Sequence, residues 1–273
     1  MDIDSQPNNQ DLPNYLEEAT KLERQALEFQ QKGDVQKAFE LYDQAAHIYK
    51  EAKDYLKAAV CFSAAATCWN IHTGWQPLHH AATRNHMAAE QAMNGRHYDY
   101  ARTLFRDAAL LYEREGDFES YSECFLESQK ADRKRSFELW WQRKFTDDMS
   151  YSEESVGVLV RLKWFFRWIL NHASNLIWGF GERPGNTLLT AVGIVFVSAC
   201  IYYFSKGLTF VAGGHHFLDS IYFSVVTFTT VGYGDIVAVG MTRMVAMLEA
   251  LSGIIVTPLF LIGLTRRYLR MYR

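Results

Sequence analysis

The sequence predicts an all-α protein in which a cytoplasmic solenoid of antiparallel helix hairpins precedes a domain with two membrane spans. Three observations predict this class: charged residues are unevenly distributed, the charge-poor part contains two long apolar runs, and a pattern of alanine and aromatic residues recurs in the rest. Charged residues make up 22% of the chain, yet residues 187–265 contain only five of them. The chain therefore divides into a polar N-terminal part and an apolar C-terminal part.

The two apolar runs occupy residues 187–205 and 241–265. Because a helix rises about 1.5 Å per residue and a bilayer core is about 30 Å thick, runs of this length can cross a membrane. We predict an outer helix over the first run and an inner helix over the second. Between them, residues 217–229 would form only about three helical turns, too few to cross. This segment is predicted to be a re-entrant pore helix.

Basic side chains precede the first span and follow the second, whereas the segment from the first span to the pore helix contains only one basic residue, Lys206. The flanking residues are Arg161, Lys163, Arg167, Arg183, Arg266, Arg267, Arg270 and Arg273. By the positive-inside rule, we expect a multi-pass protein of the cell membrane with both termini in the cytoplasm. Residues 1–12 lack the apolar core of a signal peptide and are predicted to be disordered, and residues 267–273 to be a basic tail.

Directly after the predicted pore helix, residues 230–235 read Thr-Val-Gly-Tyr-Gly-Asp. A Gly-Tyr-Gly-Asp string alone is also typical of a turn, but its position between a pore helix and a second span argues against that alternative. Over residues 178–267, the order of span, pore helix, loop and span resembles the pore of two-transmembrane potassium channels of the inward-rectifier-like and bacterial type. The pore domain is expected over residues 183–266.

The resemblance implies passive, potassium-selective conduction by a homotetramer, with K⁺ as the permeant ion and no organic cofactor. Backbone carbonyls and the Thr230 hydroxyl would replace the water oxygens of a dehydrated K⁺ ion, and four copies of the loop would complete the ring. Gly232 and Gly234 are expected because aligned carbonyls need backbone angles that side chains resist, and Tyr233 would brace the loop from behind. The assigned filter residues are Thr230, Val231, Gly232, Tyr233, Gly234 and Asp235, of which the first four would hold K⁺.

The predicted inner helix contains two positions at which it could bend. Gly253 resembles the gating hinge of the family, and Pro258 removes the backbone hydrogen bond to Ile254. The alternatives are that Gly253 serves helix packing and that Pro258 makes a static kink. Ile254, Thr257 and Leu261 recur at intervals of three and four residues, so we predict that they line the ion cavity.

Two acids of the pore domain need partners. Glu249 is the only acid inside a predicted span, which makes it a candidate modulatory residue. The alternative, favoured by the phase of the helix, is a protonated or hydrogen-bonded residue wedged behind the pore helix near its hydroxyls. In many members of the family, an acid on the pore helix pairs with the filter aspartate, but Val226 occupies that position here. Tyr222 or a water molecule is therefore the expected partner of Asp235.

The pattern Ala-x3-aromatic-x2-Ala recurs within residues 13–145 and predicts paired helices of about 20 residues each. Its copies are Ala38/Tyr42/Ala45, Ala58/Phe62/Ala65 and Ala101/Phe105/Ala108, with Tyr121/Phe125/Ser128 as a weaker copy. Helix boundaries are predicted at Gly33-Asp34, Lys53-Asp54 and Gly116-Asp117. The array resembles tetratricopeptide repeats, closer to their SNAP-like branch, whose groove commonly binds a peptide or protein partner. The alternative is a bundle that only oligomerises or solubilises the chain.

Two segments connect the repeats to the first span. Residues 146–155 are acidic and lack apolar periodicity, which predicts a linker. Residues 156–182 combine tryptophan and phenylalanine with arginine and lysine, which is typical of an amphipathic helix at the inner membrane surface. Such a helix could transmit movement of the repeats to the base of the inner helix. Gating or regulation of the pore by the repeat domain is therefore a hypothesis based on chain order.

The sequence argues against other classes of function. It contains no nucleophile and base pair, phosphate-binding loop or zinc-spaced set of cysteines and histidines, so an enzyme is not expected. The four cysteines are scattered, and the spread-out charge argues against nucleic acid as a partner. Two alternatives to a regulated channel remain: a membrane-tethered adaptor whose repeats recruit partners, and an effector that depolarises the membrane on a cellular signal.

Overall fold

The computed structural model describes residues 12–71, 77–141, 158–210 and 216–271. Within it, the chain forms two compact units, Met1–Asn171 and His172–Arg273. Each unit is helical, which confirms the predicted all-α class. The predicted linker over residues 146–155 lies outside the described residues, as does most of the predicted N-terminal tail.

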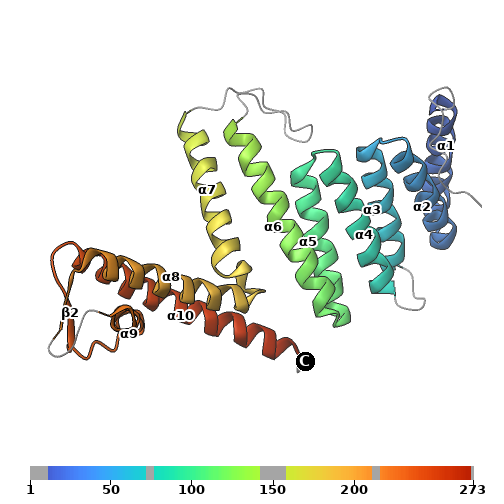
Figure 1. The fold of residues 1–273 in the computed structure, drawn as a ribbon. Helices are drawn as coiled ribbons and strands as arrows, with labels where there is room; N and C mark the ends of the chain where they lie inside the picture. The colour runs from blue at the N-terminus through green and yellow to red at the C-terminus, as the bar shows by residue number, and fades with distance from the viewer. Residues whose placement is uncertain (1–11, 72–76, 142–157, 211–215, 272–273) are drawn as a thin grey trace, which may run out of the picture. The chain divides into compact units, whose positions relative to one another are not determined.

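The first unit is a row of helices in which each helix packs mainly against its neighbours in the chain (Figure 1). The helices are α1 (Leu12–Gln31), α2 (Val35–Glu51), α3 (Tyr55–Ile71), α4 (Pro77–Asn94), α5 (Tyr98–Glu115) and α6 (Phe118–Trp141), followed by α7 (Val158–Ile177), whose first part belongs to this unit. Packing mainly between consecutive helices is the arrangement of a solenoid. The structure therefore confirms stacked helix hairpins, while the assignment to tetratricopeptide repeats remains a resemblance.

Short turns with a left-handed residue separate these helices. Gly33 and Gly116 have φ of 83° and 89°, and Lys53 takes the same region with φ of 60°. After each of these turns an aspartate begins the next helix: the Asp34, Asp54 and Asp117 carboxylates accept hydrogen bonds from the backbone N–H groups three residues later, at 3.3, 3.3 and 3.1 Å. These are the boundaries that the sequence predicts.

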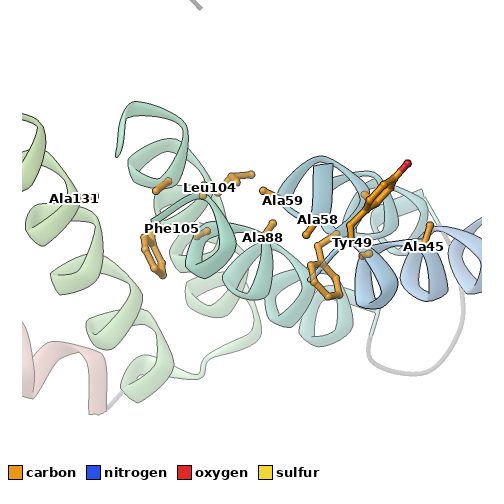
Figure 2. Packing of buried hydrophobic residues seen from close by; sticks show 14 of the residues in the cluster. Ala45, Tyr49, Ala58, Ala59, Ala88, Leu104, Phe105 and Ala131 are labelled. Atoms are coloured by element: carbon orange, nitrogen blue, oxygen red, sulfur yellow. The ribbon is translucent and has the colours of Figure 1, made fainter. Parts of the chain in front are cut away.

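The alanines of the repeated pattern let neighbouring helices approach closely, and the aromatic residues fill the space between them. In the three full copies, every alanine is fully buried and the aromatic residues are at most 5% exposed. Figure 2 shows this packing around Tyr49 and Phe105, with Ala58, Ala59 and Ala88 nearby. The core of the first unit therefore consists of small residues from α1 to α6 with aromatic rings between them.

The sequence analysis missed helix α4, which lies between the second and third copies of the pattern. Ala81 and Ala88 of α4 are fully buried at the two alanine positions, but Asn85 occupies the aromatic position. With the copy in α4 included, the copies begin at nearly regular intervals along the chain. The copy in α4 departs from the pattern at a single position, the aromatic one. An unbroken array from α1 to α6 follows from this.

The second unit contains two long apolar helices with a short helix packed against both. Its elements are the 3-10 turn η1 (Gly179–Gly181), α8 (Pro184–Ser205), β1 (Leu208–Phe210), α9 (Phe217–Phe228), β2 (Ile236–Ala238) and α10 (Thr242–Met271). The stretches Pro184–Ser205 and Thr242–Leu269 are long and apolar enough to cross a membrane, and only 22% and 17% of their most apolar windows are buried. Core helices of a soluble protein would be mostly buried, so these helices fit a lipid environment.

Candidate ion pathway

The loop that follows α9 has a left-handed residue at every second position. Thr230 and Gly232 have φ of 59°, and Gly234 has φ of 82°. The two glycines adopt this region without a steric penalty, as the sequence predicts for aligned carbonyls. Thr230 is β-branched and carries the strain of this conformation, which is a feature typical of functional sites. All residues from Thr230 to Asp235 are exposed in the single chain.

Both ends of this loop are anchored. At its start, the backbone N–H groups of Thr230 and Val231 donate to the Thr227 and Val226 carbonyls of α9, each at 3.0 Å. At its end, β2 pairs with β1 as an antiparallel ribbon that begins with Leu208 opposite Ala238. The ribbon joins the chain before α9 to the chain after the loop. The sequence analysis did not predict this pairing, because three-residue strands have no detectable period.

Asp235 has the partner that the sequence analysis named first. The Tyr222 hydroxyl of α9 lies close to its carboxylate. Val226, at the position where the resemblance to potassium channels would place an acid, has an apolar side chain that cannot form a hydrogen bond with Asp235. The end of the loop therefore faces a neutral donor on α9 instead of an acid.

Gly253 lies where α10 passes the C-terminal end of α9. It is buried, and a Cβ atom built on it would collide with the carbonyl oxygen of Phe228, the last residue of α9. Only glycine permits this approach of two backbones. The geometry thus gives Gly253 a packing role, which was the alternative to a hinge in the sequence analysis. The hinge itself remains a prediction.

The residues predicted to line the cavity are exposed on α10. Ile254 and Leu261 are 59% and 55% exposed, and Thr257 and Pro258 are exposed as well. By contrast, Gly253 is buried on the face that packs within the chain. The structure therefore leaves the predicted cavity face free in a single chain. Pro258 lies inside α10, which continues as one helix past it.

Glu249 connects α10 to both other helices of this unit and is only 2% exposed. The Tyr202 hydroxyl of α8 donates to its Oε2 atom at 2.7 Å. Its Oε1 atom is hydrogen-bonded to the Ser224 hydroxyl of α9, which also donates to the Val195 carbonyl of α8 at 2.8 Å. Glu249 thus packs against α9, the predicted pore helix, near a hydroxyl, as the favoured alternative predicts.

The sequence analysis missed a contact between α6 and α7 in the first unit. Asp132 of α6 has a side chain that is only 8% exposed, and both of its oxygens accept hydrogen bonds from the Arg167 guanidinium, at 2.8 and 3.1 Å. The Asn171 amide donates to the same carboxylate at 3.3 Å, and Arg102 of α5 lies 3.5 Å away. No local pattern reveals this contact, because its partners are 35 residues apart.

Aromatic rings extend the contact between α6 and α7. Trp140 of α6 packs against Phe165 and Trp168 of α7, with centroids 5.0 and 6.2 Å apart. Phe137 lies 6.0 Å from Trp168. The face of α7 with Phe165, Arg167 and Trp168 is therefore covered by α6. We call the contacts of Asp132, Arg167 and Asn171 the α6–α7 latch.

Comparison with known proteins agrees with the C-terminal part of this description. A family model described as an ion channel matches residues 189–270, which contain α9, the loop and most of both long helices. No curated protein and no solved structure gave a significant match. The chain therefore contains an ion-channel domain with two candidate membrane spans, so it is a membrane protein, and this domain points to a channel rather than an enzyme.

Proposed function

We propose that the protein is a potassium-selective channel, in which four chains each contribute one filter loop to a central pore. The observation that carries the proposal is the loop from Thr230 to Asp235, where the filter sequence coincides with left-handed backbone at alternate residues. The carbonyls of Thr230, Val231, Gly232 and Tyr233 and the Thr230 hydroxyl bind the dehydrated ion. Conduction is passive and follows the electrochemical gradient of K⁺.

A homotetramer supports the proposal because one loop supplies only a quarter of an ion-binding ring. In the single chain, Val231 and Tyr233 are 53% and 70% exposed. Ile254 and Leu261 leave a further apolar strip of α10 uncovered, and large exposed apolar surfaces mark interfaces or lipid contact. Assembly of four chains around the filter covers Val231 and Tyr233, and it turns Ile254 and Leu261 toward a shared cavity.

Potassium flux into liposomes tests the proposal. The purified full-length protein should pass K⁺ at least about tenfold better than Na⁺, and Gly232→Ala should abolish this preference because alanine resists the left-handed backbone. Gly193→Ala is the matched control, because a Cβ at Gly193 meets nothing within 4 Å. Absence of K⁺ selectivity, or flux that is unchanged by Gly232→Ala, would instead favour the membrane-tethered adaptor.

The membrane completes the proposed environment, with both termini on the cytoplasmic side. On α7, the apolar residues Leu159, Leu162, Phe166 and Leu170 are 83%, 48%, 54% and 65% exposed. Their spacing of three and four residues places them on one helix face. This face lies in the inner membrane surface, while Phe165, Arg167 and Trp168 contact α6.

We further propose that the repeat domain regulates opening through α7. The α6–α7 latch holds α7 with a nearly buried carboxylate that receives hydrogen bonds from Arg167 and Asn171. A ligand or protein partner that rearranges the repeats therefore acts on a helix that leads, by chain order, into the first span. The partner would be a peptide or a protein helix, as helical arrays commonly bind.

A further inference from the structure

Glu249, Tyr202 and Ser224 form a buried cluster in which hydrogen atoms can be counted. Each hydroxyl has one hydrogen to donate, and a backbone carbonyl can only accept. Tyr202 uses its hydrogen on Oε2 of Glu249, at 2.7 Å. Ser224 uses its hydrogen on the Val195 carbonyl, at 2.8 Å. No hydrogen of Ser224 is then left for its bond with Oε1 of Glu249.

The remaining bond needs a hydrogen on the carboxyl group itself. If Oε1 of Glu249 carries a proton, it donates to Ser224, Ser224 donates to Val195, and Tyr202 donates to Oε2. Every hydrogen is then used once and every contact is satisfied. An ionised Glu249 would leave the Ser224 hydrogen shared between two acceptors.

The surroundings of Glu249 lead to the same assignment. Glu249 is 2% exposed, and its two hydrogen-bond partners, Tyr202 and Ser224, are fully buried. The hydroxyl of Ser198 on α8, which is only 6% exposed, also lies near the carboxyl group and is uncharged. In the part of the chain that the structure describes, no lysine, arginine or histidine forms a salt bridge with it. A buried carboxylate without a cation is costly, and within a membrane it is more so.

We propose that Glu249 is a neutral carboxylic acid that acts as a positioning residue for the pore helix. It links α10 to α9 through Ser224 and to α8 through Tyr202, so it fixes the helix that carries the loop at 230–235. This inference rests on the proposed channel function only for the role of the cluster. The protonation of Glu249 is independent of conduction. A neutral side chain also adds no negative charge behind the ion path.

Infrared spectroscopy of the full-length protein in lipid vesicles tests the protonation. At neutral pH, the wild type should show the carbonyl stretch of a protonated carboxylic acid, and Glu249→Gln should lack that band. A wild-type spectrum without the band would overturn the proposal. Because this measurement needs no ion flux, a protein that fails to conduct would refute the channel function while the band still reports the state of Glu249.

Flux of K⁺ and Na⁺ tests the positioning role. Glutamine keeps a donor for Ser224 and an acceptor for Tyr202, so Glu249→Gln should retain K⁺ flux and selectivity within about twofold. Glu249→Ala loses both bonds and should lower selectivity or flux about tenfold or more. Ser252→Ala is the matched control on α10, because the Ser252 hydroxyl bonds only to the backbone carbonyl of Glu249, at 2.6 Å. Equal loss in the glutamine and alanine variants would contradict a neutral Glu249.

Discussion

Single residues decide how closely α9 and α10 approach. The Cβ of alanine at Gly253 would meet the Phe228 carbonyl, so Gly253→Ala must push the two helices apart. We expect a cost of about 1–3 kcal/mol and a displaced filter loop, as for other overpacked sites. Tetramer yield and K⁺ over Na⁺ selectivity should both fall, as measured by size-exclusion chromatography and vesicle flux.

Gly193→Ala serves as the control for this change. It adds the same methyl group to a helix of the same unit at a position with free space, so selectivity should remain at the wild-type value. If Gly253→Ala kept assembly and selectivity and changed only the fraction of open channels, the hinge role would be correct and the packing role wrong.

Buried thiols in the repeat domain provide a second test at the residue level. Burial raises the pKa of Cys61 and Cys124 to about 12, compared with 9.0 for a free thiol. Because the thiolate is the reactive form, both residues should resist a maleimide reagent at pH 8 in the folded protein and react after denaturation. Mass spectrometry of labelled peptides measures this, and rapid labelling of Cys61 in the native state would show that α3 is not packed as described.

The same pKa shifts set the direction of a pH effect. The folded state keeps the two thiols protonated above pH 9.0, where the unfolded chain begins to lose its protons. The contribution of the two protonated thiols to the stability of the folded state is therefore complete below about pH 9, and it is lost as the pH rises toward about 12. Thermal unfolding of a Cys61→Ala, Cys124→Ala double variant should show a weaker decline of Tm between pH 8.5 and pH 10 than the wild type.

At the level of elements, the α6–α7 latch should contribute measurable stability. Asp132→Asn leaves the Arg167 guanidinium beside a neutral group, and we expect a loss of about 1–3 kcal/mol, reduced because Arg167 is 42% exposed. For a unit of this size, Tm should fall by roughly 3–10 °C in calorimetry of the full-length protein.

The control for the latch lies on the same helix. Glu127 and Lys130 of α6 form an exposed pair at 3.0 Å, so Glu127→Gln should change stability by no more than about 0.5 kcal/mol. If the Asp132 and Glu127 variants unfolded at the same temperature, the contact between α6 and α7 would be too weak to hold α7 in place.

The elements that the sequence predicts are those with a local signal. Gly33-Asp34 marks a helix boundary because a left-handed residue and a capping carboxylate are adjacent in the chain. The α4 helix was missed because Asn85 interrupts an aromatic position, although both flanking alanines are present. The β1–β2 ribbon and the partners of Asp132 depend on contacts between distant segments, which periodicity does not encode.

The residues of the candidate site likewise divide into those with a local sequence signal and those that depend on contacts between distant segments. The loop at 230–235 was predictable because each residue type there answers a local backbone requirement. The close approach of Gly253 to Phe228 was not, because it depends on how α10 crosses α9. The cluster of Glu249, Tyr202 and Ser224 was predictable only as a position behind the pore helix, since its partners come from separate helices.

For the whole molecule, the choice of perturbation decides whether regulation by the repeats can be measured. Deleting residues 1–150 removes α6 and exposes the Phe165 and Trp168 rings that pack on it. Exposed aromatic surface promotes aggregation, so a deleted protein would lose flux for reasons unrelated to gating. A substitution within the latch avoids this problem.

We therefore expect Asp132→Ala to change K⁺ flux through the assembled protein by about threefold or more and to leave K⁺ over Na⁺ selectivity unchanged. Selectivity depends on the loop at 230–235, whereas the substitution acts on contacts between α5, α6 and α7 within Met1–Asn171. Glu127→Gln should alter neither quantity. Single-channel recording separates an altered open fraction from altered conductance. A lower Tm for Asp132→Ala with the wild-type open fraction would restrict the latch to stability, and would remove the physical basis for regulation through α7.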